Sequence, residues 1–397
     1  MNYAQQNFHD LMSLIAKNEA FCFRDFQLDD KTYRIMDYNL ASWTAFQEPN
    51  AINCRGIMFD ITNLDDVRIV SLPPAKFFNY EEGGVPHHKG KIGDKMVKMD
   101  GSLISSYIHN GEVYLKSKGA LFSSQALDAM KFLGKEKNAK LKEEVYKLTA
   151  DGYTVNFEYT APHNRIVVPY QTEELTLLCA RKMDGGQNLF ATKLMKLLDE
   201  KHLTALMSII VHHESLHDQV IDQNKFVNDI REEREGEGYV VEIVLEDGHS
   251  YLTKLKNIAY CTLHQAKDGI EAPRRLFEAV IEGTTDDLRG LFADDPATLQ
   301  RIADMENHVQ PIYNHVIKTV TDFVEANKHL DKKTFAMKAL AEHKDFGGIM
   351  INTYNGKEVD YKDLAKKRRK EWYGIADGVD PTLNKDGDAP ANRLKVA

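Results

Sequence analysis

Two kinds of hydrophobic pattern divide the chain. Up to about Lys256, apolar residues alternate with polar ones or stand in short runs between Gly, Pro, Asn and Asp turns, as in β-strands. From about Glu271 onward they recur at spacings of three and four, as on one face of an amphipathic helix. We therefore predict an α+β fold, with a mostly antiparallel-sheet domain followed by an all-helical C-terminal domain and a boundary between Gln265 and Pro273.

Individual elements follow from the same patterns. Asn110-Gly111 separates two strand-like runs and is a preferred pair for a tight hairpin turn, and Asp247-Gly248 separates two more. The strands expected are 67–72, 103–108, 112–116, 155–160, 175–179, 239–245 and 251–256. The helices expected are 124–132, 140–148, 274–281, 298–327, 333–343 and 361–372. We place the first domain at 1–266, the helical domain at 267–375 and a flexible tail, poor in large apolar residues, at 376–397.

Composition narrows the class of protein. With 43 % hydrophobic and 28 % charged residues in 397, the chain is typical of globular proteins. Its four cysteines lack C-x-x-C spacing, which argues against a zinc ribbon or a disulfide scaffold. We find no apolar run of the ~18 residues that a membrane span needs and no signal-like N-terminus, so we expect a cytoplasmic protein. The net charge of -9 disfavours coating of nucleic acid by a basic surface.

Lysines at the ends of expected strands are the candidates for chemistry. Lys98 opens Lys98-Met99-Asp100-Gly101, which by itself favours an exposed lysine before an Asp-Gly turn. Lys254 and Lys256 share one face of a strand, because side chains alternate along it. The alternation leaves open whether that face meets solvent or a site.

The order of these motifs resembles the covalent nucleotidyltransferases, and more closely the bacteriophage-type ATP-dependent RNA ligase 1 family. The resemblance rests mainly on Cys54-Arg55-Gly56, Lys76-Phe77-Phe78-Asn79, Lys98-Met99-Asp100-Gly101-Ser102, Lys116-Ser117-Lys118-Gly119, Asn156-Phe157-Glu158, Asn164-Arg165-Ile166-Val167, Glu237-Gly238-Tyr239 and Lys254-Leu255-Lys256. It continues through Asp286-Asp287-Leu288 and so covers nearly the whole chain. Met99 stands where many relatives have an acidic residue, at a position that varies among ligases.

The resemblance implies an ATP-dependent RNA ligase that also needs Mg²⁺ or Mn²⁺. A lysine attacks the α-phosphate of ATP, the AMP moves to a 5′-phosphate RNA end, and a 3′-hydroxyl displaces it. The substrate implied is single-stranded RNA or nicked tRNA, with repair of the anticodon loop and an end-healing kinase/phosphatase as a partner. Phage origin would place the enzyme in a bacterial host cytoplasm. The helical domain would give RNA or tRNA specificity.

The resemblance also gives roles to single residues. The catalytic set is Lys98 as nucleophile with Glu158, Glu237, Lys254 and Lys256. The nucleotide contacts are Tyr38, Arg55, Lys76, Lys98, Glu158, Lys254 and Lys256. The RNA contacts are Arg55, Lys76, Lys116 and Lys118, and the metal ligands are Glu237 and Asp286. An amine attacks only when neutral, and nearby cations favour that form while they stabilise phosphate oxygens.

Plainer interpretations stand beside these roles. Arg55 could pair with Asp60, Glu158 could lie on a strand edge, and Tyr38 could be packing. Asp286 stands where acids complement a helix N-terminus. The basic run at 366–370 is either a solvated helix face or a phosphate contact.

Other functions remain as alternatives. One is another covalent nucleotidyltransferase, either a DNA ligase or a capping guanylyltransferase. Both normally append a small β-barrel after the last lysine motif, where we expect helices. The other is a non-catalytic RNA-binding protein that retains the nucleotide pocket.

Overall fold

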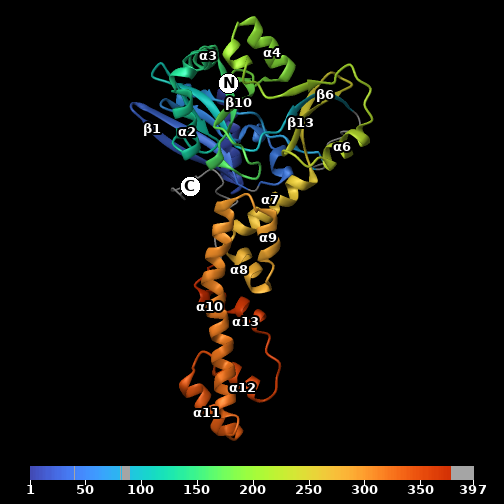
Figure 1. The fold of residues 1–397 in the computed structure, drawn as a ribbon. Helices are drawn as coiled ribbons and strands as arrows, with labels where there is room; N and C mark the ends of the chain where they lie inside the picture. The colour runs from blue at the N-terminus through green and yellow to red at the C-terminus, as the bar shows by residue number, and fades with distance from the viewer. Residues whose placement is uncertain (40, 81, 83–89, 377–397) are drawn as a thin grey trace. The chain divides into compact units, whose positions relative to one another are not determined.

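A computed structural model describes residues 1–39, 41–80, 82 and 90–376 (Figure 1). The described chain forms two compact units, one ending at His264 and the other beginning at Gln265. Three mostly antiparallel sheets build the first unit and helices build the second, which confirms the predicted fold class. The tail predicted at 376–397 lies outside the described residues from position 377 on, and the roles assigned to the two domains stay predictions.

Sheet 1 is the N-terminal, four-stranded sheet. Its antiparallel strands follow chain order: β1 (Phe21–Leu28), β2 (Lys31–Tyr38), β3 (Ile57–Asp60) and β4 (Arg68–Ser71). Helix α1 (Tyr3–Lys17), which the sequence analysis did not predict, begins at an Asn2 capping box. It buries Leu11 and Leu14 in the same apolar cluster as Phe23 and Phe59 of the sheet.

Sheet 2 has five antiparallel strands in the order β11-β10-β9-β7-β8. They are β7 (Ser102–His109), β8 (Glu112–Ser117), β9 (Tyr153–Thr160), β10 (Glu174–Lys182) and β11 (Asn188–Phe190). Figure 1 shows helices beside this sheet, namely α2 (Ser124–Leu133), α3 (Ala139–Ala150), α4 (Ala191–Glu200) and α5 (Thr204–Met207). Their apolar stripes join Val155 and Phe157 in the largest core of the unit.

Sheet 3 carries Lys254 and Lys256, and Lys98 and Glu237 directly adjoin two of its strands. Its order is β12-β6-β13-β14-β5, from β5 (Phe78–Asn79), β6 (Gly90–Val97), β12 (His213–Ser215), β13 (Gly238–Leu245) and β14 (Ser250–Lys256). Pairing of β5 with β14 is parallel, and the other described pairs of this sheet are antiparallel. Val241 and Leu255 pack against α6 (Gln223–Glu232). Because side chains alternate, Val240 and Lys254 belong to the opposite face, and Val240 contacts a cluster with Leu178 and Phe190 of sheet 2.

Both predicted hairpins are present. Ile108 pairs with Val113 across Asn110 and Gly111, which have φ of 48° and 80°. Positive φ at both positions is what the Asn-Gly pair permits at low cost. Val244 pairs with Ser250 across the second turn. These hairpins fix the register of β7 with β8 and of β13 with β14.

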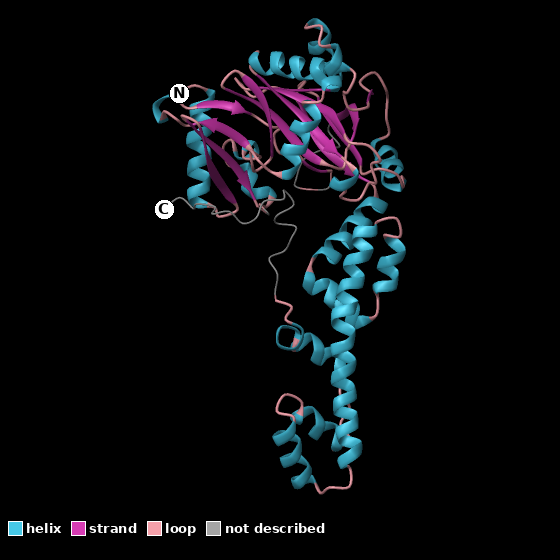
Figure 2. Cartoon of the chain, turned by 60° about the vertical axis from the view of Figure 1, so that its left-hand side comes forward, coloured by secondary structure: helices cyan, strands magenta, loops and turns pink. Residues whose placement is uncertain are grey.

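The second unit is helical, and the helices predicted at 274–281, 298–327 and 333–343 begin one or two residues earlier than predicted. Helix α7 (Ile258–Glu271) crosses the boundary between the units. The helices after it are α8 (Pro273–Glu282), α9 (Thr285–Leu291), α10 (Pro296–Asn327), α11 (Lys332–Glu342), α12 (Gly347–Tyr354), α13 (Tyr361–Lys367) and α14 (Arg369–Tyr373). The 32-residue α10 is about 48 Å long and runs through this unit in Figure 2. It supplies Val309 to one apolar cluster and Val320 to another.

The basic run at 366–370 departs from the single helix predicted over 361–372. The helix breaks at Arg368, and Lys366 and Lys367 pair with Glu282 and Asp363. Arg369 is buried and its Nε donates to the carbonyl of Ile375 at 3.0 Å. These pairings within the unit favour a structural role over phosphate contact. None of the described helices is long and apolar enough to cross a membrane.

Candidate active site

The proposed nucleophile, Lys98, follows the last residue of β6. Its backbone N–H donates to the carbonyl of Gly238 at 2.9 Å, which continues the pairing of β6 with β13 beyond Val97. The Nζ donates to Oε2 of Glu237 at 2.7 Å. The pairing of the two strands therefore brings together two motifs that lie far apart in the sequence.

Glu237 is a buried bridge between two lysines. Its side chain is 3 % exposed, and its Oε1 lies 2.8 Å from Nζ of Lys256 while Oε2 holds Lys98. Burial alone would raise the pKa of Glu237, but Lys98 and Lys256 outweigh burial and hold that pKa below its usual value. Glu237 is therefore an anion that fixes both ammonium groups in place.

Lys254 lies on the same face of β14 as Lys256, in surroundings that disfavour its charge. Its Nζ stands 5.3 Å from the centre of the Phe77 ring. Burial, followed by the charges of Lys76 and Lys98, pushes the pKa of Lys254 well below its usual value. An anion placed beside Lys254 would raise this pKa again, because it would favour the charged form of the amine.

Glu158 approaches the nucleophile motif from β9 of sheet 2. Its Oε1 accepts a hydrogen bond from the backbone N–H of Gly101 at 3.0 Å. Burial raises the pKa of Glu158 to about 7, against a smaller lowering effect of Lys98. Strand β9 lies between β10 and β7, so the alternative that placed Glu158 on a strand edge is wrong.

Asp100 anchors the loop that follows Lys98. Its Oδ2 accepts from the N–H groups of Val167 and Val168 at 2.8 Å, and its Oδ1 accepts from the hydroxyl of Tyr260 at 2.7 Å. Its own N–H donates to the hydroxyl of Tyr170 at 3.0 Å. The sequence analysis did not predict roles for the two tyrosines.

A second group of cations surrounds Tyr38. Lys76 donates from Nζ to the Tyr38 hydroxyl at 3.2 Å, and Lys118 lies over the ring at 4.7 Å while pairing with Asp37 at 3.3 Å. Burial would raise the pKa of Tyr38, but Arg55, Lys118 and Lys76 together lower it. The Tyr38 ring thus lies beside these cations and also packs edge-on against the Phe46 ring, with 4.9 Å between the ring centres.

Two adjoining cavities connect these groups. A cavity of about 110 Å³ is lined by Arg55, Lys98, Glu158 and Lys254, among other residues. A larger one, of about 460 Å³, is lined by Lys76 and other residues, and Phe77 and Met96 border both cavities.

Arg55 does not form the ion pair with Asp60 that was the alternative to a phosphate contact. Arg55 donates to the carbonyl of Pro74 at 3.4 Å, whereas Asp60 pairs with Lys31 at 3.5 Å, so that alternative is wrong.

Lys116 does not support the RNA contact expected of it. Its side chain is fully buried, and Nζ donates to the carbonyl of Gly56 at 2.7 Å and to that of Ser117 at 3.1 Å. In this structure Lys116 ties β8 to the turn after Arg55. A side chain without exposed surface cannot reach RNA, so its effect on Arg55 is indirect.

Asp286 belongs to the second unit. It is exposed in the first turn of α9, together with Asp287, where acidic side chains complement the helix dipole. Asp286 therefore stands where an acidic side chain complements a helix N-terminus, and its role as a metal ligand stays a prediction.

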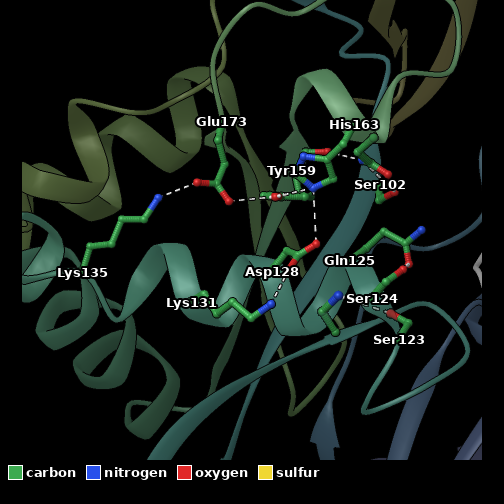
Figure 3. A network of polar contacts seen from close by, with 12 residues as sticks. Ser102, Ser123, Ser124, Gln125, Asp128, Lys131, Lys135, Tyr159, His163 and Glu173 are labelled. Atoms are coloured by element: carbon green, nitrogen blue, oxygen red, sulfur yellow. Dashed lines mark hydrogen bonds and ion pairs between the residues drawn. The ribbon is translucent and has the colours of Figure 1, made fainter. Parts of the chain in front are cut away.

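A polar network supports the far side of β9 (Figure 3). Tyr159, the neighbour of Glu158, donates its hydroxyl to Glu173 at 2.9 Å. His163 Nε2 lies 3.3 Å from Asp128 of α2. These contacts tie β9 to the helix that covers it, and so fix the strand that carries Glu158.

Comparison with known proteins places this arrangement in a family. Residues 53–260 match the family described as RNA ligase, and residues 267–371 match the C-terminal domain of T4 RNA ligase 1. The chain belongs to the RNA ligase family of the T4 RNA ligase 1 type. Every candidate site residue of the first unit from Arg55 to Lys256 lies within the RNA ligase match.

Individual relatives are distant. The chain is 26 % identical over 308 residues to a putative bifunctional polynucleotide kinase/RNA ligase of Autographa californica nuclear polyhedrosis virus, covering 71 % of this chain and 41 % of that one. It is 30 % identical over 157 residues to a putative RNA ligase of Thermovibrio ammonificans, covering 39 % and 40 %. It is 24 % identical over 214 residues to an RNA ligase of Rhodothermus phage RM378, covering 48 % of each. The chain thus spans less than half the length of each relative.

The chain also aligns with solved structures of other proteins. An archaeal ATP-dependent RNA ligase aligns over 80 % of this chain and 79 % of its own, with a TM-score of 0.44 and 10 % identity. An RNA ligase of Naegleria gruberi with pyrophosphate aligns over 45 % and 52 %, with a TM-score of 0.35 and 16 % identity.

Glu158 should make stability depend on pH. Its folded pKa of about 7 lies above the ordinary 4.5, so the folded chain holds this proton more tightly than the unfolded chain does. The stabilisation is complete below about pH 4.5 and is lost as the pH rises through 7. Glu158→Gln has no such proton, so its free energy of unfolding relative to the native protein should rise by roughly 2 to 3 kcal/mol between pH 5 and pH 8. Urea unfolding at both pH values measures it, and parallel pH profiles for the two proteins would contradict the assignment.

Proposed function

We propose that this protein is an ATP-dependent RNA ligase that joins 5′-phosphate and 3′-hydroxyl RNA ends through lysine-AMP and RNA-adenylate intermediates. The observation that carries the proposal is the convergence of Arg55, Lys76, Lys254 and Lys256 around the amine of Lys98. Cations gathered around a nucleophilic amine suit attack on a polyphosphate, because they favour the neutral amine and stabilise the charge on phosphoryl oxygens.

Lysine adenylylation is the first step. The Nζ of Lys98 loses a proton and attacks the α-phosphorus of ATP; an N–P bond forms while the P–O bond to pyrophosphate breaks. Lys254 and Lys256 stabilise the oxygens of the α-phosphate. Glu237 holds the amine of Lys98 beside them before the nucleotide enters. Tyr38 and Glu158 contact the nucleoside, with the Glu158 carboxylate accepting hydrogen bonds from ribose hydroxyls.

Glu237 also fits the role of a ligand for Mg²⁺ or Mn²⁺, because it is an anionic carboxylate at the proposed reaction centre. Both of its oxygens hold ammonium groups, so a cation reaches Glu237 in exchange for one of them. The ion supplies charge neutralisation for the phosphate oxygens when it is bound. Asp286, in the helical unit, is the other residue that we propose as a metal ligand.

The RNA contacts proposed are Arg55, Lys76 and Lys118. Arg55 suits phosphate through its forked donors, and Lys76 and Lys118 suit it as mobile charges. Lys116 acts on this surface indirectly, through Gly56. Single-stranded RNA or nicked tRNA is the proposed substrate, an end-healing kinase/phosphatase the proposed partner, and the cytoplasm of a bacterial host the proposed location.

Helices support an RNA ligase over the rival nucleotidyltransferases. From Asn257 to Ala376 the described chain contains helices and no strand, where a DNA ligase or a capping enzyme would normally continue into a small β-barrel. We assign the second unit to recognition of structured RNA. The remaining rival is a non-catalytic RNA-binding protein. Such a protein would form no covalent bond to AMP, and the next experiment tests for that bond.

Replacement of Lys98 is the direct test of the proposed function. Lys98→Ala and Lys98→Arg should both abolish retention of ³²P from α-labelled ATP on the denatured protein, because neither side chain supplies a neutral amine. Joining of RNA that carries a pre-formed 5′-adenylate should survive in part, which separates loss of the first step from loss of the fold. Label retained by Lys98→Ala at the native level would rule out this nucleophile. A native protein that takes up no label would rule out the ligase itself.

Lys254 and Lys256 should act on the rate of the first step. Replacing either by Ala should slow adenylylation by orders of magnitude, since one lost charge donor costs ~3 to 4 kcal/mol of transition-state stabilisation. Lys196→Ala, an exposed lysine of α4, is the matched control and should keep the native rate. The rates come from rapid-quench labelling. Native rates after both replacements would mean that this strand face only meets solvent and takes no part in the reaction.

The helical unit should select substrates. A chain ending at His264 keeps every proposed catalytic residue except Asp286 and should retain some self-adenylylation. Joining of a nicked anticodon stem-loop should fall more than joining of a short oligonucleotide, because contacts outside the active site are lost. Comparison of the two chains on both substrates measures this. Equal losses would mean that the helices support the first unit instead.

A further inference from the structure

A second chemical cluster lies on the same face of sheet 3 as the lysines. Asp94 of β6 and Glu242 of β13 are 3 % and 6 % exposed, and His217 follows β12. Asp94 precedes Lys98 by four residues, or about 13 Å along a strand. One ligand atom from each of the three side chains lies within 4.8 Å of the others. This cluster, Asp94-His217-Glu242, has no role in the ligation chemistry proposed above.

The backbone is specially arranged at this cluster. The register of β6 with β13 shifts between the pairs Val241–Lys95 and Ile243–Ile92, so two residues of β6 oppose Glu242. Such a bulge reverses the alternation of side chains. Ile92 lies in the core beneath α6, whereas Asp94, two positions later, borders the larger cavity beside Glu242. The bulge therefore turns Asp94 toward the carboxylate of the neighbouring strand.

Room for the cluster depends on Gly93. A Cβ at this position would lie 2.7 Å from Oε2 of Glu242 and 2.9 Å from Cε1 of His217, closer than side chains tolerate. The loop that carries His217 is held over the same residue, because the N–H of Leu216 donates to the carbonyl of Gly93 at 3.1 Å. Glycine lets the carboxylate and the imidazole approach each other above β6.

The distances within the cluster suit a metal ion. Nε2 of His217 lies 3.5 Å from Oδ1 of Asp94 and 3.4 Å from Oε2 of Glu242, too far for a good hydrogen bond to either. Ligands about 2.1 Å from a tetrahedral ion stand about 3.4 Å apart. The imidazole therefore faces both carboxylates at the separation that a shared cation would set.

Other contacts hold the carboxylates in place. Asp94 accepts from the N–H and hydroxyl of Thr192 at 3.3 and 3.0 Å. Oε1 of Glu242 accepts from Ser250 at 2.6 Å and Lys193 at 2.9 Å, and its Oε2 lies 3.4 Å from the N–H of Asp94. Burial would raise the pKa of Glu242, but Ser250 and Lys193 hold it below its usual value. Hydrogen bonds of this kind orient the ligands of metal sites.

We propose that Asp94, His217 and Glu242 bind one divalent transition-metal ion, with Zn²⁺ as the chemical type. Imidazole selects Zn²⁺ over Mg²⁺, which prefers oxygen ligands and water. Three protein ligands leave one tetrahedral position open. Asp94 and Glu242 both border the cavity of about 460 Å³ that Lys76 also lines, so an anionic ligand in that cavity is the group that the open position would take.

The test measures binding to the full chain without any ligation assay. After chelator dialysis, the native protein should bind one equivalent of Zn²⁺ by calorimetry in the presence of excess Mg²⁺. Co²⁺ in its place should give the intense visible bands of tetrahedral coordination. His217→Ala and Asp94→Asn should weaken Zn²⁺ binding by at least about 10-fold and remove those bands. His212→Ala, a nearby exposed histidine outside the cluster, should change neither.

His217 is the decisive variant because its ring is 38 % exposed and its loss leaves the core intact. Zn²⁺ should also raise the melting temperature of the native protein and of His212→Ala but not that of His217→Ala, since a ligand that binds the folded state stabilises it. Absence of Zn²⁺ binding, or native affinity in His217→Ala, would overturn the proposal and leave a histidine paired with two carboxylates.

Discussion

The carboxylate of Glu237 is the interaction on which the arrangement of the site depends. It joins Lys98, directly after β6, to Lys256, the last residue of β14, and Glu237 itself directly precedes β13, the strand between them. A buried carboxylate without partners would be costly, and two buried or half-buried ammonium groups without a counterion would repel each other. The two strand pairings and the ion pairs thus stabilise one another, and the nucleophile has a fixed position before any nucleotide arrives.

The balance of charged side chains in the cleft also explains why a polyanion suits the proposed site. Glu237 neutralises two cations, whereas burial and the neighbouring charges of Lys76 and Lys98 hold the pKa of Lys254 well below its usual value. Glu158, with its raised pKa, adds less negative charge than an ordinary carboxylate. Among the described side chains of the cleft the cations outnumber the anions, and in the proposed reaction the triphosphate provides further negative charge. Asp100 gives this cluster a rigid base through four hydrogen bonds to distant segments.

Sequence patterns predicted the elements that have a local cause. Hairpins built on Asn110-Gly111 and Asp247-Gly248 were correct because turn geometry depends on the turn residues themselves. Helices α1 and α7 were not predicted, although Leu11 and Leu14 of α1 lie in an apolar cluster. The order of the motifs, through the family resemblance, predicted that the lysines and glutamates of the cleft share one site. The burial of Lys116 could not be predicted from the sequence, because it depends on the carbonyl of Gly56, sixty residues earlier in the chain.

Alternation along a strand explains why one sheet face can hold two separate groups of polar residues. On β14 the alternation is regular, and Lys254 and Lys256 face the cleft while Thr253 and Leu255 are buried. On β6 a regular alternation would place Asp94 with Ile92 in the core, where a carboxylate without partners would destabilise the fold by several kcal/mol. The bulge opposite Glu242 removes that conflict and turns Asp94 to the polar face. Because of this irregularity, Ile92 lies in the apolar core while Asp94, although buried, lies beside its polar partners on the other face.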